Sequence, residues 1–173
     1  MSVPETRVKS TAQGFWQAKR LVLMALFIAL SVIGALLKIP SPTGTVALDS
    51  APGFLGAALL GWKEGFIIAA LGHLASAYSA GFPLSLPLHL IIALMMGLAV
   101  SVFAVLLHKI NALLAIIVAV FINGVLMPLS FVPMFGMPFF YGMVAPLTVA
   151  ALVNTVLAYL LYRALKNVPQ VRP

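Results

Sequence analysis

Long apolar runs, separated by short polar or proline-containing breaks, make up most of this chain. Such runs predict helices, because a helix satisfies its own backbone hydrogen bonds and can therefore lie in lipid. Several runs approach the ~20 residues that a helix needs to cross a bilayer. The pattern predicts an all-α integral membrane protein, a compact bundle of six transmembrane helices. The expected helices cover residues 21–37, 51–61, 66–80, 88–107, 112–127 and 141–162.

The second apolar run is shorter than the others. At a rise of ~1.5 Å per residue, a helix of this length falls short of a full span of the membrane. We expect this helix to be tilted, or extended at its start through residues 46–50. Three proline-bearing breaks are expected to form loops on one side of the membrane: residues 38–50, 81–87 and 128–140. Long proline-rich loops in that position are typical of segments that cap a site.

Lysines and arginines gather on one side of the expected bundle. Of the 10 basic residues in the chain, Lys38 alone falls on the side of the proline-bearing loops. Since basic residues are enriched in cytoplasmic loops, we expect both termini in the cytoplasm. The net charge of +7 then fits anionic lipid better than nucleic acid as a partner. The cytoplasmic set comprises Arg7, Lys9, Lys19, Arg20, Lys63, Lys109, Arg163, Lys166 and Arg172.

The same pattern divides the chain into three parts. Residues 1–20 are expected to form a cytoplasmic N-terminal segment, residues 21–166 the six-helix membrane domain, and residues 167–173 a cytoplasmic tail. The chain is 63% hydrophobic and only 8% charged, which is too little charge to cover the surface of a soluble domain.

Composition excludes several classes of function. The chain has no cysteine, so disulfides, thiolate catalysis and cysteine-ligated metals are absent. Its three acids are Glu5, Asp49 and Glu64, and no two of them can form a catalytic pair on one side of the membrane. None is expected mid-span, where ion-coupled transporters carry their coupling acids. We therefore expect neither an enzyme nor a bound cofactor, and a transporter would need partners to power it.

Two histidines are the main polar features of the apolar runs. His73 lies in the third expected helix, and His89 begins the fourth beside a proline-bearing loop. An ionisable residue within a membrane is a candidate for function, although a neutral imidazole can also simply bridge two helices. A metal or haem held by the two histidines is a further alternative, but it lacks a third ligand for a metal.

Buried amides and a single acid extend the candidate site. Asn123 and Asn154 lie in the last two expected helices, where either could bridge helices or bind a solute. Asp49 precedes the short second helix and could cap its free amides, as could Ser50, or bond to a solute. The remaining candidates lie in or near the outer loops, where aromatic rings could form an interfacial belt or stack on a flat ligand. They are Tyr78, Phe82, Ser85, Phe139 and Tyr141.

Three stretches together resemble the substrate-binding S-components of energy-coupling factor (ECF) vitamin transporters. They are KRLVLMALFIALSVIGALLKIP, VALDSAPGFLGAALLGWKEGFIIAALGHLASA and GFPLSLPLH. In the first, Ala25 and Ala29 match the Ala-x-x-x-Ala motif of the family. The resemblance covers residues 19–166, nearly the whole chain.

The resemblance implies a subunit of a prokaryotic cytoplasmic membrane that captures a vitamin-like solute from outside. It implies docking through Ala25 and Ala29 on a transmembrane coupling subunit, toppling in the bilayer, and power from two cytoplasmic ATPase subunits. The stretches look most like the type that binds α-ribazole, a cobalamin precursor. Pantothenate, a thiamine precursor, or a pyridine or pterin compound are alternative substrates. Two alternatives are of another class. One is a haem-binding membrane anchor that uses the two histidines, and the other is a facilitator that transports a solute without partner subunits.

Overall fold

The computed structural model describes residues 5–44 and 46–169. Residues 1–4 of the expected N-terminal segment, Thr45, and residues 170–173 of the expected tail, with Arg172, lie outside the described residues. The described chain is helical, with a single isolated bridge and no regular strand. Its helices are α1 (Glu5–Gly34), α2 (Ala51–Leu60), α3 (Trp62–Ser79), α4 (Leu86–Lys109), α5 (Ala112–Phe121), the π-helical turn η1 (Ile122–Leu126), α6 (Met127–Ser130) and α7 (Val132–Leu165).

The helical class expected from the sequence is confirmed. Within the described residues, three segments are long and apolar enough to cross a membrane on their own. They are Leu86–Lys109, Ala112–Ser130 (α5, η1 and α6 taken together) and Val132–Leu165. The short α2 has only 10 residues, so it cannot span a bilayer at ~1.5 Å per residue.

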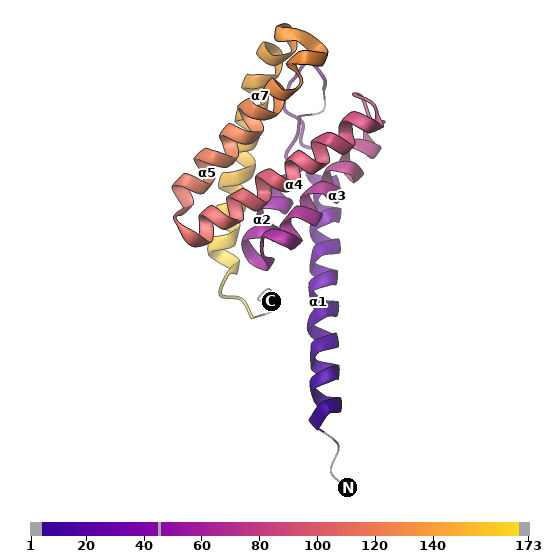
Figure 1. Ribbon diagram of the computed structural model, residues 1–173, viewed down its shortest axis with the longest axis vertical. Helices are drawn as coiled ribbons and strands as arrows, with labels where there is room; N and C mark the ends of the chain where they lie inside the picture. Colours follow the sequence, from indigo (N-terminus) through magenta and orange to yellow (C-terminus); the bar gives the residue numbers. More distant parts are fainter. Residues whose placement is uncertain (1–4, 45, 170–173) are drawn as a thin grey trace.

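The helices pack as a bundle in which chain neighbours lie side by side. In Figure 1, α1 runs down one flank and its N-terminal half extends beyond the ends of the other helices. The α3–α4 pair crosses the middle of the view, and α5 and α7 form the opposite flank. The core is built around the rings of Phe54 and Phe103, whose centroids are 5.1 Å apart in an edge-to-face arrangement. Because α2 is buried along most of its length, it serves as the inner element around which the longer helices assemble.

The first loop folds into a small hairpin that leans on α7. Lys38 pairs with Ala47, and the amide of Ile39 donates to the carbonyl of Val46 at 2.8 Å. Val46 is buried in a small cluster with Met143 and Ala150 of α7. The hairpin is thereby held over one end of the bundle, where Figure 1 shows it beside the start of α7.

The segment 128–140, expected as a loop, is largely helical. Pro133 lies in the first turn of α7, where a missing N–H costs no helical hydrogen bond, and Pro128 lies in α6, directly after the π-helical turn η1. The chain turns at Gly136, whose φ of +76° belongs to the left-handed region that glycine adopts without strain. The prolines in this segment therefore mark helix starts and a kink, and the expectation of an irregular loop is wrong.

Apart from Lys38 in the hairpin, the basic residues that close the described helices gather at the opposite end of the bundle. Arg20 reaches from α1 to the α2–α3 junction, where its Nη2 lies 2.7 Å from Glu64 Oε1 and donates to the carbonyl of Leu60 at 2.7 Å. Lys19 Nζ donates to the carbonyl of Pro169 at 3.2 Å. On the side away from the hairpin, α1 is thus tied to the α2–α3 junction through Arg20 and to the last described residues of the chain through Lys19.

Candidate functional site

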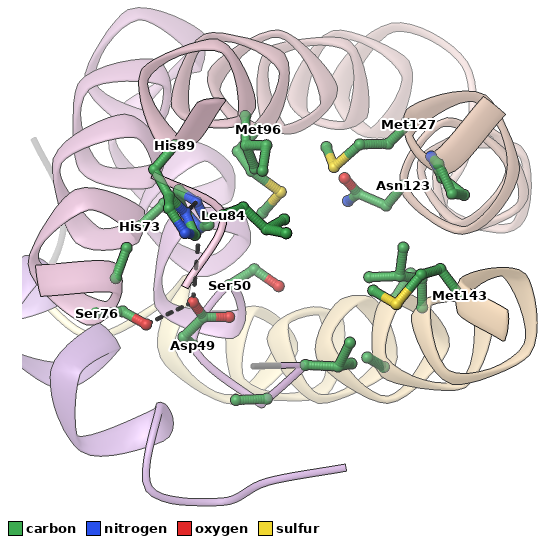
Figure 2. A pocket seen from close by; sticks show the side chains of 18 of the residues that line it. Asp49, Ser50, His73, Ser76, Leu84, His89, Met96, Asn123, Met127 and Met143 are labelled. Atoms are coloured by element: carbon green, nitrogen blue, oxygen red, sulfur yellow. Dashed lines mark hydrogen bonds and ion pairs between the residues drawn. The ribbon is translucent and has the colours of Figure 1, made fainter. Parts of the chain in front are cut away.

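A cavity of about 110 Å³ opens at the hairpin end of the bundle. Its lining comes from the hairpin and the residues just before α2, the second half of α3, the α3–α4 loop, the first half of α4, η1 with α6, and α7. Figure 2 shows these side chains pointing inward from opposite sides. Since a water molecule needs roughly 10–15 Å³ measured in this way, the space holds several waters or a small solute.

One wall of the cavity is a polar network. Ser76 Oγ donates to Asp49 Oδ2 at 2.9 Å, and His73 Nδ1 lies 3.8 Å from the same carboxylate oxygen. His73 Nε2 and His89 Nδ1 are 3.1 Å apart and share a hydrogen bond. Figure 2 shows the two imidazoles and the carboxylate grouped on one side of the cavity. The three groups form a chain that runs from the acid through one ring to the other.

Two residues that line the cavity each carry a buried polar atom without a partner in the described part of the protein. His89 is 3% exposed and its Nε2 makes no hydrogen bond, and Asn123 is 5% exposed with an equally unpaired Oδ1. Both side chains line the cavity, from α4 and η1 respectively. A buried polar atom without a partner costs about 1–3 kcal/mol, so a ligand or water that bonds to it recovers that cost.

The π-helical turn explains how Asn123 reaches the cavity. The five residues of η1 lie between α5 and α6, and π-helical turns within a helix are frequent at functional sites. Gly124 permits the turn to lie against α7, because a Cβ at this position would overlap the side chain of Thr148. With this close approach, the amide that precedes the glycine is directed inward (Figure 2).

Asn154 also lines the cavity, but both its side-chain oxygen and its side-chain nitrogen are hydrogen-bonded to the backbone. Its Oδ1 accepts from the amide of Ala51 at 2.9 Å, and its Nδ2 donates to the carbonyl of Ala47 at 3.3 Å. The side chain of Asn154 therefore caps the N-terminus of α2 from α7. The suggestion that Asp49 or Ser50 caps this helix is wrong, since Ser50 occupies the N-cap position without a capping bond and the Asp49 carboxylate turns to Ser76.

The opposite wall of the cavity is apolar and soft. Methionine side chains are flexible and polarisable, so they adapt to the outline of a bound ring. Figure 2 shows Met127 and Met143 across the cavity from the histidines, with Asn123 between them. The apolar lining includes Met96, Met127, Phe131, Phe139, Met143 and Leu147.

The structure brings together six of the side chains expected at the site. Asp49, His73, His89, Asn123, Phe139 and Asn154 all line the cavity. The other four candidates lie outside the lining, and Tyr78 and Tyr141 are 76% and 66% exposed. The ring of Phe82 contacts that of His89, with centroids 5.7 Å apart, and Ser85 is an exposed residue at the start of α4.

Sequence reasoning missed several polar and apolar lining residues. Ser76 follows His73 by three positions on α3, a spacing that places both side chains on one helix face and could have revealed it. Lys38 and Ser50 also line the cavity, from the hairpin and from its junction with α2. Neither lies in a segment of periodic sequence, so the hydrophobic pattern does not predict their position.

The histidine pair is not arranged to hold a haem iron between its rings. Two imidazole nitrogens on opposite sides of an ion, each at ~2.0–2.1 Å from it, lie about 4 Å apart, farther than the 3.1 Å between His73 Nε2 and His89 Nδ1. For a metal ion, the described residues contain no group of three or more His, Cys, Asp or Glu side chains that could hold it.

Ala25 and Ala29 lie on the outer face of α1. Both are exposed, among larger exposed apolar residues such as Leu26 and Leu30. Small residues on an apolar face allow a second helix to approach closely in a membrane.

Comparison with solved structures finds a similar fold in one described as the S component of a bacterial ECF transporter. The match has a TM-score of 0.66 at 21% sequence identity, and covers 87% of this chain and 97% of the other. A search of curated protein sequences finds no match. The family model of the ECF transporter substrate-specific component matches residues 19–169. Members of this family are membrane subunits that bind a small-molecule substrate for an ECF module. Since the match spans most of this chain, the chain belongs to the family of substrate-specific components of ECF transporters.

Proposed function

We propose that this chain captures a vitamin-like heterocyclic solute from outside the cell, with α-ribazole as the best candidate, for uptake in cobalamin salvage. One observation carries the proposal: two residues that line one cavity, His89 and Asn123, each have a buried polar atom without a partner among the described residues, Nε2 and Oδ1. The rest of the lining is a polar network and an apolar wall. A site of this kind suits a ligand with a flat apolar body and a few polar groups.

The chemistry of α-ribazole fits both walls. Its benzimidazole ring would pack among Met127, Met143 and Phe139, where soft thioether and aromatic surfaces favour a flat ring. Its ribose hydroxyls would bond to His89 and Asn123. Pantothenate, a thiamine precursor, and pyridine or pterin compounds also combine apolar and polar parts, so they are the competitors that binding measurements must exclude.

The charge distribution supports an orientation. Arg20, Lys63 and Lys109 lie at the end of the bundle away from the cavity, while Lys38 lies at the cavity. By the positive-inside rule the basic end and both termini are cytoplasmic, and the cavity faces outward. The solute would then reach the cytoplasm by toppling of this subunit on the coupling subunit, driven by two ATPase subunits.

Binding tests the proposal directly. Small molecules that co-purify with the protein are identified by mass spectrometry, and the affinity for α-ribazole is measured by calorimetry beside the competing vitamins. The His89→Ala variant should lose about 1–3 kcal/mol of binding free energy. His108→Ala is the matched control, because His108 bonds to the carbonyl of Ala58 at 3.0 Å and does not line the cavity. Equal affinity in wild type and His89→Ala would remove His89 from the site.

Docking is tested separately from binding. Ala25→Trp and Ala29→Trp should abolish uptake by cells that carry the ECF module and leave calorimetric binding intact, because bulk at these positions blocks helix approach. Leu30→Trp is the control, since it exchanges one large exposed apolar side chain for another on the same helix. Rapid flux of solute into liposomes that contain this chain alone would contradict the need for a coupling module.

A further inference from the structure

The order of polar contacts around the cavity restricts where the protons of the two imidazoles lie. His73 turns Nδ1 toward Asp49 Oδ2 at 3.8 Å and Nε2 toward His89 Nδ1 at 3.1 Å. His89 lines the cavity, and its other nitrogen, Nε2, is buried and has no partner among the described residues. Each ring has one nitrogen for each neighbour, so the position of the proton on His73 determines its position on His89.

We propose that Asp49, acting through His73, holds His89 with a lone pair on Nε2, so that the site selects a solute that donates an N–H or O–H at this point. In a neutral imidazole one nitrogen carries the proton and the other accepts. A carboxylate favours a proton on the nitrogen nearest to it, which is His73 Nδ1. His73 Nε2 is then an acceptor, His89 Nδ1 must donate to it, and His89 Nε2 is left as an acceptor.

The surroundings favour this neutral arrangement over a charged His73. The side chains of His73 and Asp49 are 16% and 15% exposed, and a second buried charge is costly in such a place. Asp49 Oδ2 already accepts from Ser76 Oγ at 2.9 Å, so the carboxylate has a close donor without a charged imidazole. Lys38 is the one other charged side chain in the lining, and its positive charge also disfavours a second cation at the cavity.

The inference rests on the proposed function only in its second half, which concerns the solute. His73 and Asp49 are positioning residues in this scheme, because they act on the solute through His89. A solute with only acceptors at this point would face the lone pair of Nε2 and be rejected, whereas a hydroxyl or ring N–H would be bound. Asn123 Oδ1 is a second acceptor without a partner, so two donors on one solute match the cavity.

Nitrogen-15 NMR of the ligand-free protein in lipid tests the first half. Histidine is labelled in the full chain, the spectra are recorded at about pH 8, where an unperturbed imidazole is neutral, and each signal is assigned with single His→Gln variants. His73 and His89 should carry their proton on Nδ1 and show an unprotonated Nε2. His108 serves as an internal reference with the opposite tautomer, because its Nε2 must carry a proton to donate to the carbonyl of Ala58. A protonated Nε2 on His89 in the wild-type protein would overturn the proposal.

The Asp49→Asn variant tests the role of the carboxylate. Loss of the charge should produce a mixture of proton positions on His73 and a protonated fraction at His89 Nε2. Glu64→Gln, which removes a carboxylate at the opposite end of the bundle, should leave both rings unchanged. Unchanged proton positions in a folded Asp49→Asn variant would show that Asp49 does not set them. If that variant does not fold, the wild-type spectrum still decides the assignment.

Adding α-ribazole separates this inference from the proposed function. On binding, the His89 Nε2 signal should shift in the direction of an accepted hydrogen bond while the atom stays unprotonated. An Nε2 that gains a proton, or that does not respond to saturating α-ribazole, would overturn the selection of a donor at this point. Failure of α-ribazole to bind, with the expected proton positions intact, would count against the proposed substrate alone. In that case pantothenate and the other competing vitamins take its place in the same experiment.

Discussion

Two buried asparagines line the same cavity from neighbouring elements and have opposite surroundings. On the α7 wall, Asn154 is 1% exposed and bonds to the amide of Ala51 and the carbonyl of Ala47. On the η1 wall, Asn123 is nearly as buried, yet its Oδ1 has no partner in the described part of the chain. The same side chain therefore stabilises the fold at one wall and leaves bonding capacity for a solute at the other.

Removing the amide that is bonded should cost the most. Asn154→Leu leaves the first turn of α2 and the carbonyl of Ala47 without their partner, and each buried group left unpaired costs about 1–3 kcal/mol. We expect a loss of roughly 3 kcal/mol in the free energy of unfolding, measured by thermal unfolding in a mild detergent. Binding should fall with it, because the hairpin loses its anchor. A variant as stable as the wild type would show that α2 does not depend on this cap.

A smaller loss should follow from Gly124→Ala. The added Cβ would lie 2.7 Å from the Cα of Thr148, so η1 and α7 would have to separate. Overpacking of this kind costs about 1–3 kcal/mol, and the displaced turn should also weaken binding through Asn123. Thr148→Ala is the control, since it alters the same contact without forcing the helices apart. Full stability and affinity in Gly124→Ala would contradict the close approach.

The unpaired amide should behave in the opposite way. Asn123→Leu removes an acceptor that has no partner, so the stability of the ligand-free protein should stay the same or rise slightly. Its affinity for the solute should fall about tenfold, which corresponds to ~1.4 kcal/mol. Calorimetry and thermal unfolding on the same sample measure both quantities. A large loss of stability would erase the distinction between the two asparagines.

The smallest effect is expected outside the cavity. Tyr141 is 66% exposed and does not line the site, so Tyr141→Ala should change binding and stability by less than about 0.5 kcal/mol. Phe139→Ala, two positions earlier and within the lining, is the matched comparison. A strong loss of affinity in Tyr141→Ala would mean that the outer aromatic residues close over the bound solute.

The sequence predicts the helices and several site residues because each gives a local signal. Apolar runs are sufficient for the α4 span, and rare imidazoles within such runs single out His73 and His89. That the two rings meet, 16 residues apart, depends on the way α3 and α4 pack, which no local pattern encodes.

Two errors arise where a residue type has more than one structural use. Proline suggests a loop over residues 128–140, but at the first turn of a helix it is well tolerated. Asp49 is a good N-cap residue by type, yet the cap comes from Asn154, 103 positions away from the amide that it binds. Long-range contacts of this kind cannot be read from neighbouring residues.

The bonds of Asn154 have a consequence for the acid beside them. They hold the chain at Ala47 and Ala51, on either side of Asp49. Because the backbone on both sides of Asp49 is hydrogen-bonded to α7, the carboxylate is restricted in position although it belongs to a connecting segment. It can thus direct its charge at a neighbouring ring with the accuracy normally reserved for side chains on rigid secondary structure.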